Sequence, residues 1–400
     1  MTKAFTYTDK ELYGKLARPR GELLFEPSLD QDNINGRGFN YTLVLDSDTR
    51  VVPDSVFELL EIAAAHPDKA IIQPAIKMDC EPQDSIFMHI EAMRQAINEP
   101  LTNSITIILG RSGFCGKGLI KNVEYVQKCC GTPENPIETV PIDVISHDTF
   151  EAAILKPLYA GDVHLLEAPC HNYVTWDIRE RRWNRGELLL ATYFFPRLIG
   201  PPVLFLQRWL QGERFIETKV RTVSHLDPAS EYLAHAALRQ IVMKPLLVLY
   251  VFLSDFIVLR WTWQPIAAIM FLVIIFPKIA TCRRGNIRAV IVETAASVLQ
   301  FTPESVVGTV RILRALKAHL TGNAQWVPQR SVEEEFKLYN PFVFSFRYLW
   351  CYMVFSAFCG ITIKLVMSQA KFMMVMMGTV FALPFYAGFT ALPAVAGLQD

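Results

Sequence analysis

The apolar residues of this chain are concentrated in its second half, and this uneven distribution limits the possible folds. Hydrophobic residues make up 51% of the 400 residues, and the excess lies after residue 187. A helix that spans a membrane needs about 20 apolar residues in a row. Four stretches approach this length and predict two pairs of transmembrane helices, at 241–259, 264–280, 342–366 and 372–398. The alternative, buried helices of a large soluble core, is disfavoured by four such stretches in one half.

Basic residues between the two predicted pairs indicate how the helices are oriented. Segment 281–341 is rich in lysine and arginine, and the positive-inside rule places such a loop in the cytoplasm. The first half of the chain and the C-terminal tail then also lie in the cytoplasm. Lys244 and Asp255 fall within the first predicted pair, where charge is costly in lipid, so they should face protein or a polar path.

Two further segments of the second half predict amphipathic helices. Stretch 187–210 is apolar, is flanked by arginine and is broken by Pro196, Pro201 and Pro202, which predicts helices lying on the bilayer. Stretch 287–320 has helical periodicity with one apolar face, so we expect a helix that runs along the membrane.

The first half reads as an α/β domain built around residues 41–50. An apolar run at 41–45 predicts a buried strand that ends in Asp46 and Asp48. Alternate strand residues point the same way, so both carboxylates can face one point beyond the strand, where open α/β sheets bind ligands. Two carboxylates suit a divalent cation that carries a phosphate group. The alternative is a polar turn. A helix at 53–66 and a strand at 70–74 follow, as in a sheet covered by helices.

Two later segments of the first half carry candidate site residues. The glycine-rich segment 110–118 lets backbone approach a ligand closely, although it matches no known phosphate-binding loop. His147 and Asp148 lie before a predicted helix at 150–158, and Asp148 is a candidate general base. A purely structural His–Asp pair is the alternative.

Arginine is abundant just before the apolar half. Segment 179–185 contains four arginines around Trp183. Guanidinium groups bind phosphate oxygens in pairs, and an indole face stacks on the apolar side of a sugar ring. A basic segment at a membrane surface is the alternative. Arg20 and Gly21 lie in another short basic stretch, which could contact a nucleotide or simply be a solvated loop.

Composition excludes some other functions. The net formal charge is zero, which gives no global signal for nucleic-acid binding. The eight cysteines show no spacing typical of a metal site and predict thiols in a reducing compartment. Residues 1–22 are polar and charged, unlike a signal peptide.

Taken in order, the motifs resemble those of membrane-embedded family 2-type glycosyltransferases. The similarity is closest to the osmoregulated periplasmic glucan glucosyltransferases and to the glycosyltransferase domain of cyclic β-1,2-glucan synthases. It covers about residues 15–335. The segments that carry it are 46–48, 113–118, 133–135 with 146–152, 181–186 and 326–330.

The resemblance implies a GT-A-type (Rossmann-like) catalytic domain and specific residue roles. Asp46 and Asp48 would hold Mg²⁺ or Mn²⁺ on the diphosphate of UDP-glucose. Asp148 would take the proton of the acceptor hydroxyl, and His147 would orient it. The remaining implied roles are contact with the donor or its diphosphate by Arg182, Arg20 and Gly21, and contact with the acceptor by Trp183, Arg179, Gly113, Phe114, Gly116 and Lys117. Trp326 would belong to a segment that closes over the site.

The chain departs from the family pattern in two places. Position 179 is arginine where the family has glutamine, which weakens the acceptor inference there. Only a short segment precedes Asp46, so the catalytic domain is expected to be N-terminally truncated. The expected parts are an incomplete catalytic domain at 1–186, interfacial helices at 187–240, a transmembrane pair at 241–280, a cytoplasmic gating segment at 281–341 and a second transmembrane pair at 342–400.

The resulting hypothesis is a multi-pass membrane enzyme that extends a β-glucan from UDP-glucose by metal-dependent, inverting transfer at the cytoplasmic face. Its expected partners are the nucleotide sugar, the growing glucan and the lipid bilayer, with no nucleic acid. The alternatives are a synthase of a chitin-like or hyaluronan-like polymer, a catalytically inactive fragment or partner subunit, and a transporter with a cytosolic domain. The sequence does not indicate the oligomeric state.

Overall fold

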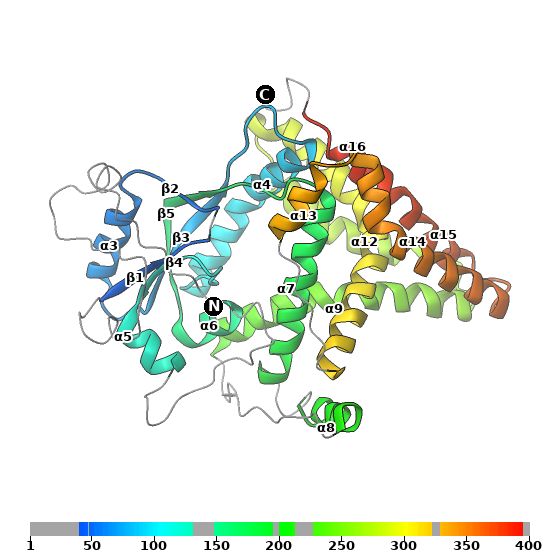
Figure 1. Cartoon of the computed structure of the whole chain (residues 1–400), viewed down its shortest axis with the longest axis horizontal. Helices are drawn as coiled ribbons and strands as arrows, with labels where there is room; N and C mark the ends of the chain where they lie inside the picture. The colour runs from blue at the N-terminus through cyan, green and yellow to red at the C-terminus, as the bar shows by residue number, and fades with distance from the viewer. Residues whose placement is uncertain are drawn as a thin grey trace.

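A mixed β-sheet with flanking helices forms one end of the molecule, and an assembly of long helices forms the other (Figure 1). The computed structural model describes residues 40–46, 48–130, 148–194, 200–212, 227–321 and 329–394. The strands are β1 (Tyr41–Val44), β2 (Arg50–Val51), β3 (Ile71–Met78), β4 (Gly118–Lys121) and β5 (Leu158–Glu167). The helices near the sheet are α3 (Ser55–Ala65), α4 (Ile86–Leu109), α5 (Asn122–Tyr125), η1 (Val126–Cys130) and α6 (Asp148–Leu155).

The helical end contains the longest elements. In chain order, its helices up to residue 286 are α7 (Tyr173–Phe194), α8 (Gly200–Gln211), α9 (Pro228–Phe256), α10 (Trp263–Met270), η3 (Phe271–Ile275), α11 (Phe276–Thr281) and η4 (Arg284–Asn286). They are followed by α12 (Ile287–Thr321), α13 (Gln329–Phe336), α14 (Pro341–Val366), α15 (Lys371–Thr379), η5 (Val380–Ala382) and α16 (Leu383–Thr390).

The sheet has the strand order β1-β4-β3-β5-β2. Strands β1 and β3 are antiparallel to β4, whereas β3 and β5 are parallel to each other. Strand β2 is antiparallel to β5. Strands β1, β3 and β5 therefore run in one direction, and their C-terminal ends share one edge of the sheet with the start of β4.

Apolar side chains alternate between the two faces of the sheet. Ile71 of β3 packs with Ala152 and Leu155 of α6, whereas its neighbour Ile72 packs with Leu59 and Ala63 of α3. This is the period-two pattern of a strand that is buried on both faces. The predicted elements at 41–45, 53–66, 70–74 and 150–158 are confirmed as β1, α3, β3 and α6, with shifted ends. Helix α4 and strand β5 were not predicted.

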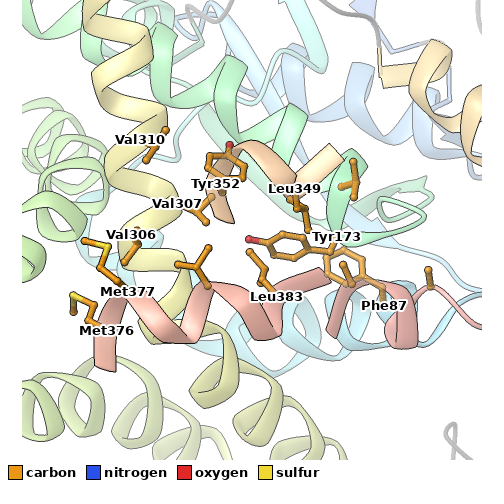
Figure 2. Packing of buried hydrophobic residues seen from close by; sticks show 14 of the residues in the cluster. Phe87, Tyr173, Val306, Val307, Val310, Leu349, Tyr352, Met376, Met377 and Leu383 are labelled. Carbon is orange, nitrogen blue, oxygen red and sulfur yellow. The ribbon is translucent and has the colours of Figure 1, made fainter. Parts of the chain in front are cut away.

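One apolar core joins the membrane helices to each other and to α4 and α7. Figure 2 shows Phe87 of α4 and Tyr173 of α7 near residues of α12, α14, α15 and α16. Helix α12 packs mainly against α9 and α7 and also contacts α4, α8 and α15. The helix predicted at 287–320 is thus confirmed, and it lies in the middle of the assembly.

Three helical segments are long and apolar enough to cross a membrane: Trp263–Thr281, Pro341–Val366 and Lys371–Thr390. The two halves of α9 form a fourth if they are counted as one span, with a bend of 50° between them. The bend lies at residues 237–240, between the halves Pro228–Ala236 and Ile241–Phe256. These segments coincide with the four predicted stretches, so the chain has the helices of a multi-pass membrane protein.

Lys244 and Asp255, the charged residues of α9 within the predicted span, face protein, as predicted. Asp255 accepts hydrogen bonds from the backbone N–H groups of Phe372 (3.2 Å) and Met373 (2.6 Å) at the start of α15. Lys244 lies 3.3 Å from a carboxylate oxygen of Glu304 on α12. Neither charge has to be solvated by lipid.

Candidate active site

The segment between β1 and β2 crosses the edge of the sheet at which β1, β3 and β5 end. Strands β1 and β2 are the two outer strands of the sheet. The connection between them carries Asp46 and Asp48 past the strand ends, and it turns there, because the N–H of Thr49 donates to the carbonyl oxygen of Asp46 (3.1 Å).

Three carboxylates meet at this edge. Asp46, Asp48 and Glu167, the last residue of β5, each offer one oxygen, and these oxygens all lie within 4.8 Å of one another. Thr49 fixes the turn, because its hydroxyl donates to Glu167 Oε1 (2.7 Å) and accepts from the N–H of Asp46 (3.2 Å). The oxygen-only donor set fits a hard divalent cation such as Mg²⁺ or Mn²⁺.

Lys117 lies among these carboxylates. Its Nζ is 3.1 Å from Asp46 Oδ2 and 2.8 Å from Glu167 Oε1. The antiparallel pairing of Val44 with Gly118 explains this position, because it puts the residue before β4 beside the residues after β1. Burial by itself would lower the pKa of Lys117, but Glu167 and Asp46 outweigh burial and raise that pKa above its usual value. The amine is therefore a permanent positive charge at neutral pH.

The glycine-rich segment links this carboxylate group to Asp148. Gln73 of β3 holds the segment in place, since its side chain accepts from the N–H of Cys115 (3.1 Å) and donates to Cys115 Sγ (3.1 Å). Gly116 follows with φ of +75°, and a Cβ at this position would lie 3.3 Å from Asp148 Oδ1. The Asp148 carboxylate, at the start of α6, therefore lies directly against the loop that presents Lys117.

Helix α7 approaches Asp148 from the other side. Thr149 donates a hydrogen bond of 2.5 Å to Glu187 of α7. Trp183 lies one helical turn before Glu187 and thus on the same side of the helix. Its ring is 40% exposed, and the Arg179 guanidinium lies 4.6 Å from the ring centre. An exposed indole braced by a cation is a suitable platform for an apolar sugar face.

The arginines of α7 do not act as one group. Arg179 lies over Trp183 and 4.0 Å from Glu91 of α4. Arg181 points away, to Asp177 at 2.5 Å. Arg182 is half-buried. The phosphate-binding cluster of four arginines that the sequence suggested is therefore divided between two faces of the helix.

The other predicted site residues are placed as follows. Phe114 is buried in the core beneath the sheet with Ile71 and Ile120, whereas Gly113 has open space around it. Arg20, Gly21, His147 and Trp326 lie outside the described residues.

Sequence reasoning missed Glu167, Glu187 and Glu91. Glu167 was missed because β5 was not predicted, although Leu158, Ala160, Val163 and Leu165 carry apolar signals typical of a strand. Glu187 and Glu91 lie on helices far apart in sequence from their partners, and no local pattern marks them. Burial and the neighbouring Asp148 raise the pKa of Glu187 above its usual value, although the Thr149 hydrogen bond opposes this.

Comparison with known proteins supports the resemblance that the motifs indicate. Over 199 residues, or 44% of this chain, the sequence is 25% identical to the cyclic beta-(1,2)-glucan synthase NdvB of Rhizobium meliloti. Over 42% of the chain it is 24% identical to the glucans biosynthesis glucosyltransferase H of Pseudomonas aeruginosa and of Escherichia coli. The predicted resemblance is confirmed.

The similarity is partial on both sides. The matched region spans 7% of the cyclic glucan synthase and 20% of the two glucosyltransferases. No protein-family model matches the chain. The chain is therefore similar to glucan-synthesising glucosyltransferases. That it shares their activities and substrates is a proposal.

Proposed function

We propose that this chain is a membrane-integrated, inverting glycosyltransferase of the GT-A type that transfers glucose from UDP-glucose to a β-glucan at the cytoplasmic face. One observation carries the proposal: a carboxylate group that fits a divalent cation, a candidate base and an exposed tryptophan come from distant segments to one edge of the sheet. Similarity to glucan glucosyltransferases supports it.

In this proposal the sheet edge binds the donor. Asp46, Asp48 and Glu167 would hold Mg²⁺ or Mn²⁺, which supplies positive charge for a diphosphate. Lys117 is already paired with two of these carboxylates. When the cation binds them, these ion pairs would break and the Lys117 amine would turn toward the phosphate oxygens. Arg182, and Arg20 with Gly21 from the N-terminal segment, would complete the diphosphate contacts.

The acceptor would lie on the α7 side. Trp183, braced by Arg179, would carry the terminal sugar, and Asp148 would accept the proton of its hydroxyl, with His147 orienting Asp148. The hydroxyl oxygen then forms a bond to the anomeric carbon while the bond to the UDP oxygen breaks. A single displacement of this kind inverts an α-linked donor to a β-linked product. The loop at 113–117, which lies against Asp148, would help to exclude water from the reacting atoms.

The test is UDP release by the purified chain in nanodiscs with a β-glucan acceptor. UDP-glucose, UDP-N-acetylglucosamine and UDP-glucuronate are compared, each with Mn²⁺, Mg²⁺ or chelator. We expect release from UDP-glucose only, loss of release with chelator, and loss of at least about 100-fold in Asp148→Asn, as for removal of a general base.

Two carboxylate variants sharpen this test. Glu167→Gln is expected to raise the Mn²⁺ concentration needed for half-maximal release, because it removes one of three ligands. Glu58→Gln, on the exposed side of α3, is the matched control. Release from another donor would replace the product but keep the mechanism, whereas no release from any donor would contradict the proposed activity of this chain.

A further inference from the structure

Five charged side chains, three of them buried, join α7 to the helices of the membrane end. Arg311 of α12 is fully buried, with its Nε 2.6 Å from Asp177 Oδ1 and its Nη2 2.5 Å from Glu304 Oε1. Arg181 Nη2 lies 2.5 Å from Asp177 Oδ2, and Lys244 Nζ lies 3.3 Å from Glu304 Oε2. We call these five residues the α7–α12 ionic cluster.

Every charge of the cluster has partners. Each carboxylate touches two cations, and each also accepts from a tyrosine: Asp177 from Tyr352 at 3.1 Å, and Glu304 from Tyr173. Burial by itself would raise the pKa of both carboxyl groups, but Arg311 outweighs it and lowers both pKa values. Both groups are therefore ionised at neutral pH, and the guanidinium of Arg311 is held by two elements at once.

Stability alone does not explain such a cluster. Its surroundings are apolar, and Figure 2 shows Val307 and Val310 of α12 packed near Tyr173 and Tyr352. Replacing buried ion pairs by well-packed apolar side chains is often neutral or stabilising. Charged groups instead make the contact directional, because the planar guanidinium group donates its hydrogen bonds in a fixed geometry.

The cluster lies on the side of α7 opposite to the candidate acceptor site. At 3.6 residues per turn, Asp177 and Arg181 point roughly half a turn away from Arg179 and Trp183. We propose that the α7–α12 ionic cluster fixes the rotation and depth of α7, so that Asp177 and Arg311 are positioning residues for Arg182 and Trp183. The proposal rests on the proposed function for its kinetic consequence but not for its geometry.

A glycine supports this reading of the cluster. The Lys244 side chain runs over Gly308 of α12 to reach Glu304, and a Cβ at position 308 would overlap its Cδ methylene. The absence of a side chain at Gly308 therefore leaves room on the α12 surface where the lysine crosses it. Gly308→Ala would displace Lys244 without changing any residue of α7.

The size of the expected effect follows from the geometry of a helix. A side chain about 5–6 Å from the helix axis moves by about 2 Å when the helix turns by about 20°. A misplacement of about 1 Å at a reacting centre can cost about 100-fold in rate. The three carboxylates of the candidate metal site lie on the sheet, whose apolar clusters are separate from that of the membrane helices, so affinity for Mn²⁺ alone should not change.

The experiment compares Arg311→Lys with Arg314→Lys, an exposed arginine one turn further along α12. Lysine keeps the charge at 311 but cannot bridge Asp177 and Glu304 together. Three quantities are measured in nanodiscs: kcat and KM for glucosyl transfer, affinity for Mn²⁺ without nucleotide, and the rate of disulfide formation between Thr149→Cys and Glu187→Cys. The wild-type side chains at 149 and 187 are in contact, so the disulfide reports the position of α7 without requiring activity.

For Arg311→Lys we expect a fall in kcat of about 10- to 100-fold, slower disulfide formation and unchanged Mn²⁺ affinity. Asp177→Asn should act in the same direction and Gly308→Ala more weakly, while Arg314→Lys should resemble wild type. Unchanged disulfide formation in Arg311→Lys would overturn the proposal. Mn²⁺ affinity that falls together with kcat would overturn it too, because a general loss of structure predicts that result. If wild type transfers no sugar, the proposed function fails, and the disulfide rate still decides the positioning role.

Discussion

At the scale of single residues, the candidate site depends on the absence of a side chain at Gly116. The residue has φ of +75°, a conformation that side chains other than glycine adopt at a cost. Its missing Cβ also leaves room for the Asp148 carboxylate. The same residue thus shapes the loop that presents Lys117 and lets the candidate base approach that loop.

A pair of glycine variants separates these two effects. Gly110 also has positive φ, of +67°, but nothing lies within 4 Å of its added Cβ. Alanine should cost about 1 kcal/mol of backbone strain at either position. We expect similar losses of thermal stability in Gly116→Ala and Gly110→Ala, but a loss of UDP release only in Gly116→Ala. Equal activity of the two variants would contradict a role for the space beside Asp148.

At the scale of elements, charged residues within the apolar half serve to connect helices. Asp255 near the end of α9 binds the first free N–H groups of α15, where a helix dipole favours negative charge. Lys244 of α9 reaches α12 in a similar way. Both were recognised in the sequence only as residues that lipid would not tolerate, and their partners lie 60 or more positions away.

Asp255 is therefore expected to act as a capping residue supplied by another helix. Asp255→Ala removes both hydrogen bonds and should destabilise the protein by about 0.5–2 kcal/mol, the usual range for a lost N-cap. Asp255→Asn keeps an acceptor oxygen and should lose much less. Thermal unfolding in detergent would show this difference, and an alanine variant as stable as wild type would exclude the capping role.

At the scale of the whole molecule, α7 and α12 connect the sheet end to the membrane end. Helix α12 packs on α9, which carries the bent span, and on α7, which touches α6 beside Asp148. The apolar core is continuous through these helices. A shift of the membrane helices would therefore be transmitted to the candidate acceptor side rather than absorbed in a linker.

The proposed orientation makes a prediction about access from outside the cell. The turn at 367–370 should be extracellular or periplasmic, and the α11–η4 connection, with exposed Cys282, should be cytoplasmic. In single-cysteine variants of intact cells, an impermeant maleimide should label Ser368→Cys directly. It should label Cys282 only after the membrane is permeabilised. The reverse labelling pattern would invert the topology and separate the sheet from cytoplasmic nucleotide sugars.

The sequence alone determined the features that follow from local pattern. Apolar length predicted the membrane helices, because spanning lipid demands a minimum number of apolar residues whatever the neighbours are. Short apolar runs predicted β1 and β3, and stretches read as helical predicted α3 and α6. The Asp46 and Asp48 pair and the glycine-rich segment stood out for the same reason, since their residue types are adjacent in the chain.

The tertiary structure decided which distant residues meet. The strand order placed Asp46 beside Glu167, a residue of an element that the sequence did not reveal. Packing of α7 on α12 turned Arg181 inward and left Trp183 exposed, although both belong to one arginine-rich motif. Ionic and hydrogen-bonding partners of this kind have no sequence period. They are selected by strand order and helix packing, which depend on burial of apolar surface over the whole chain.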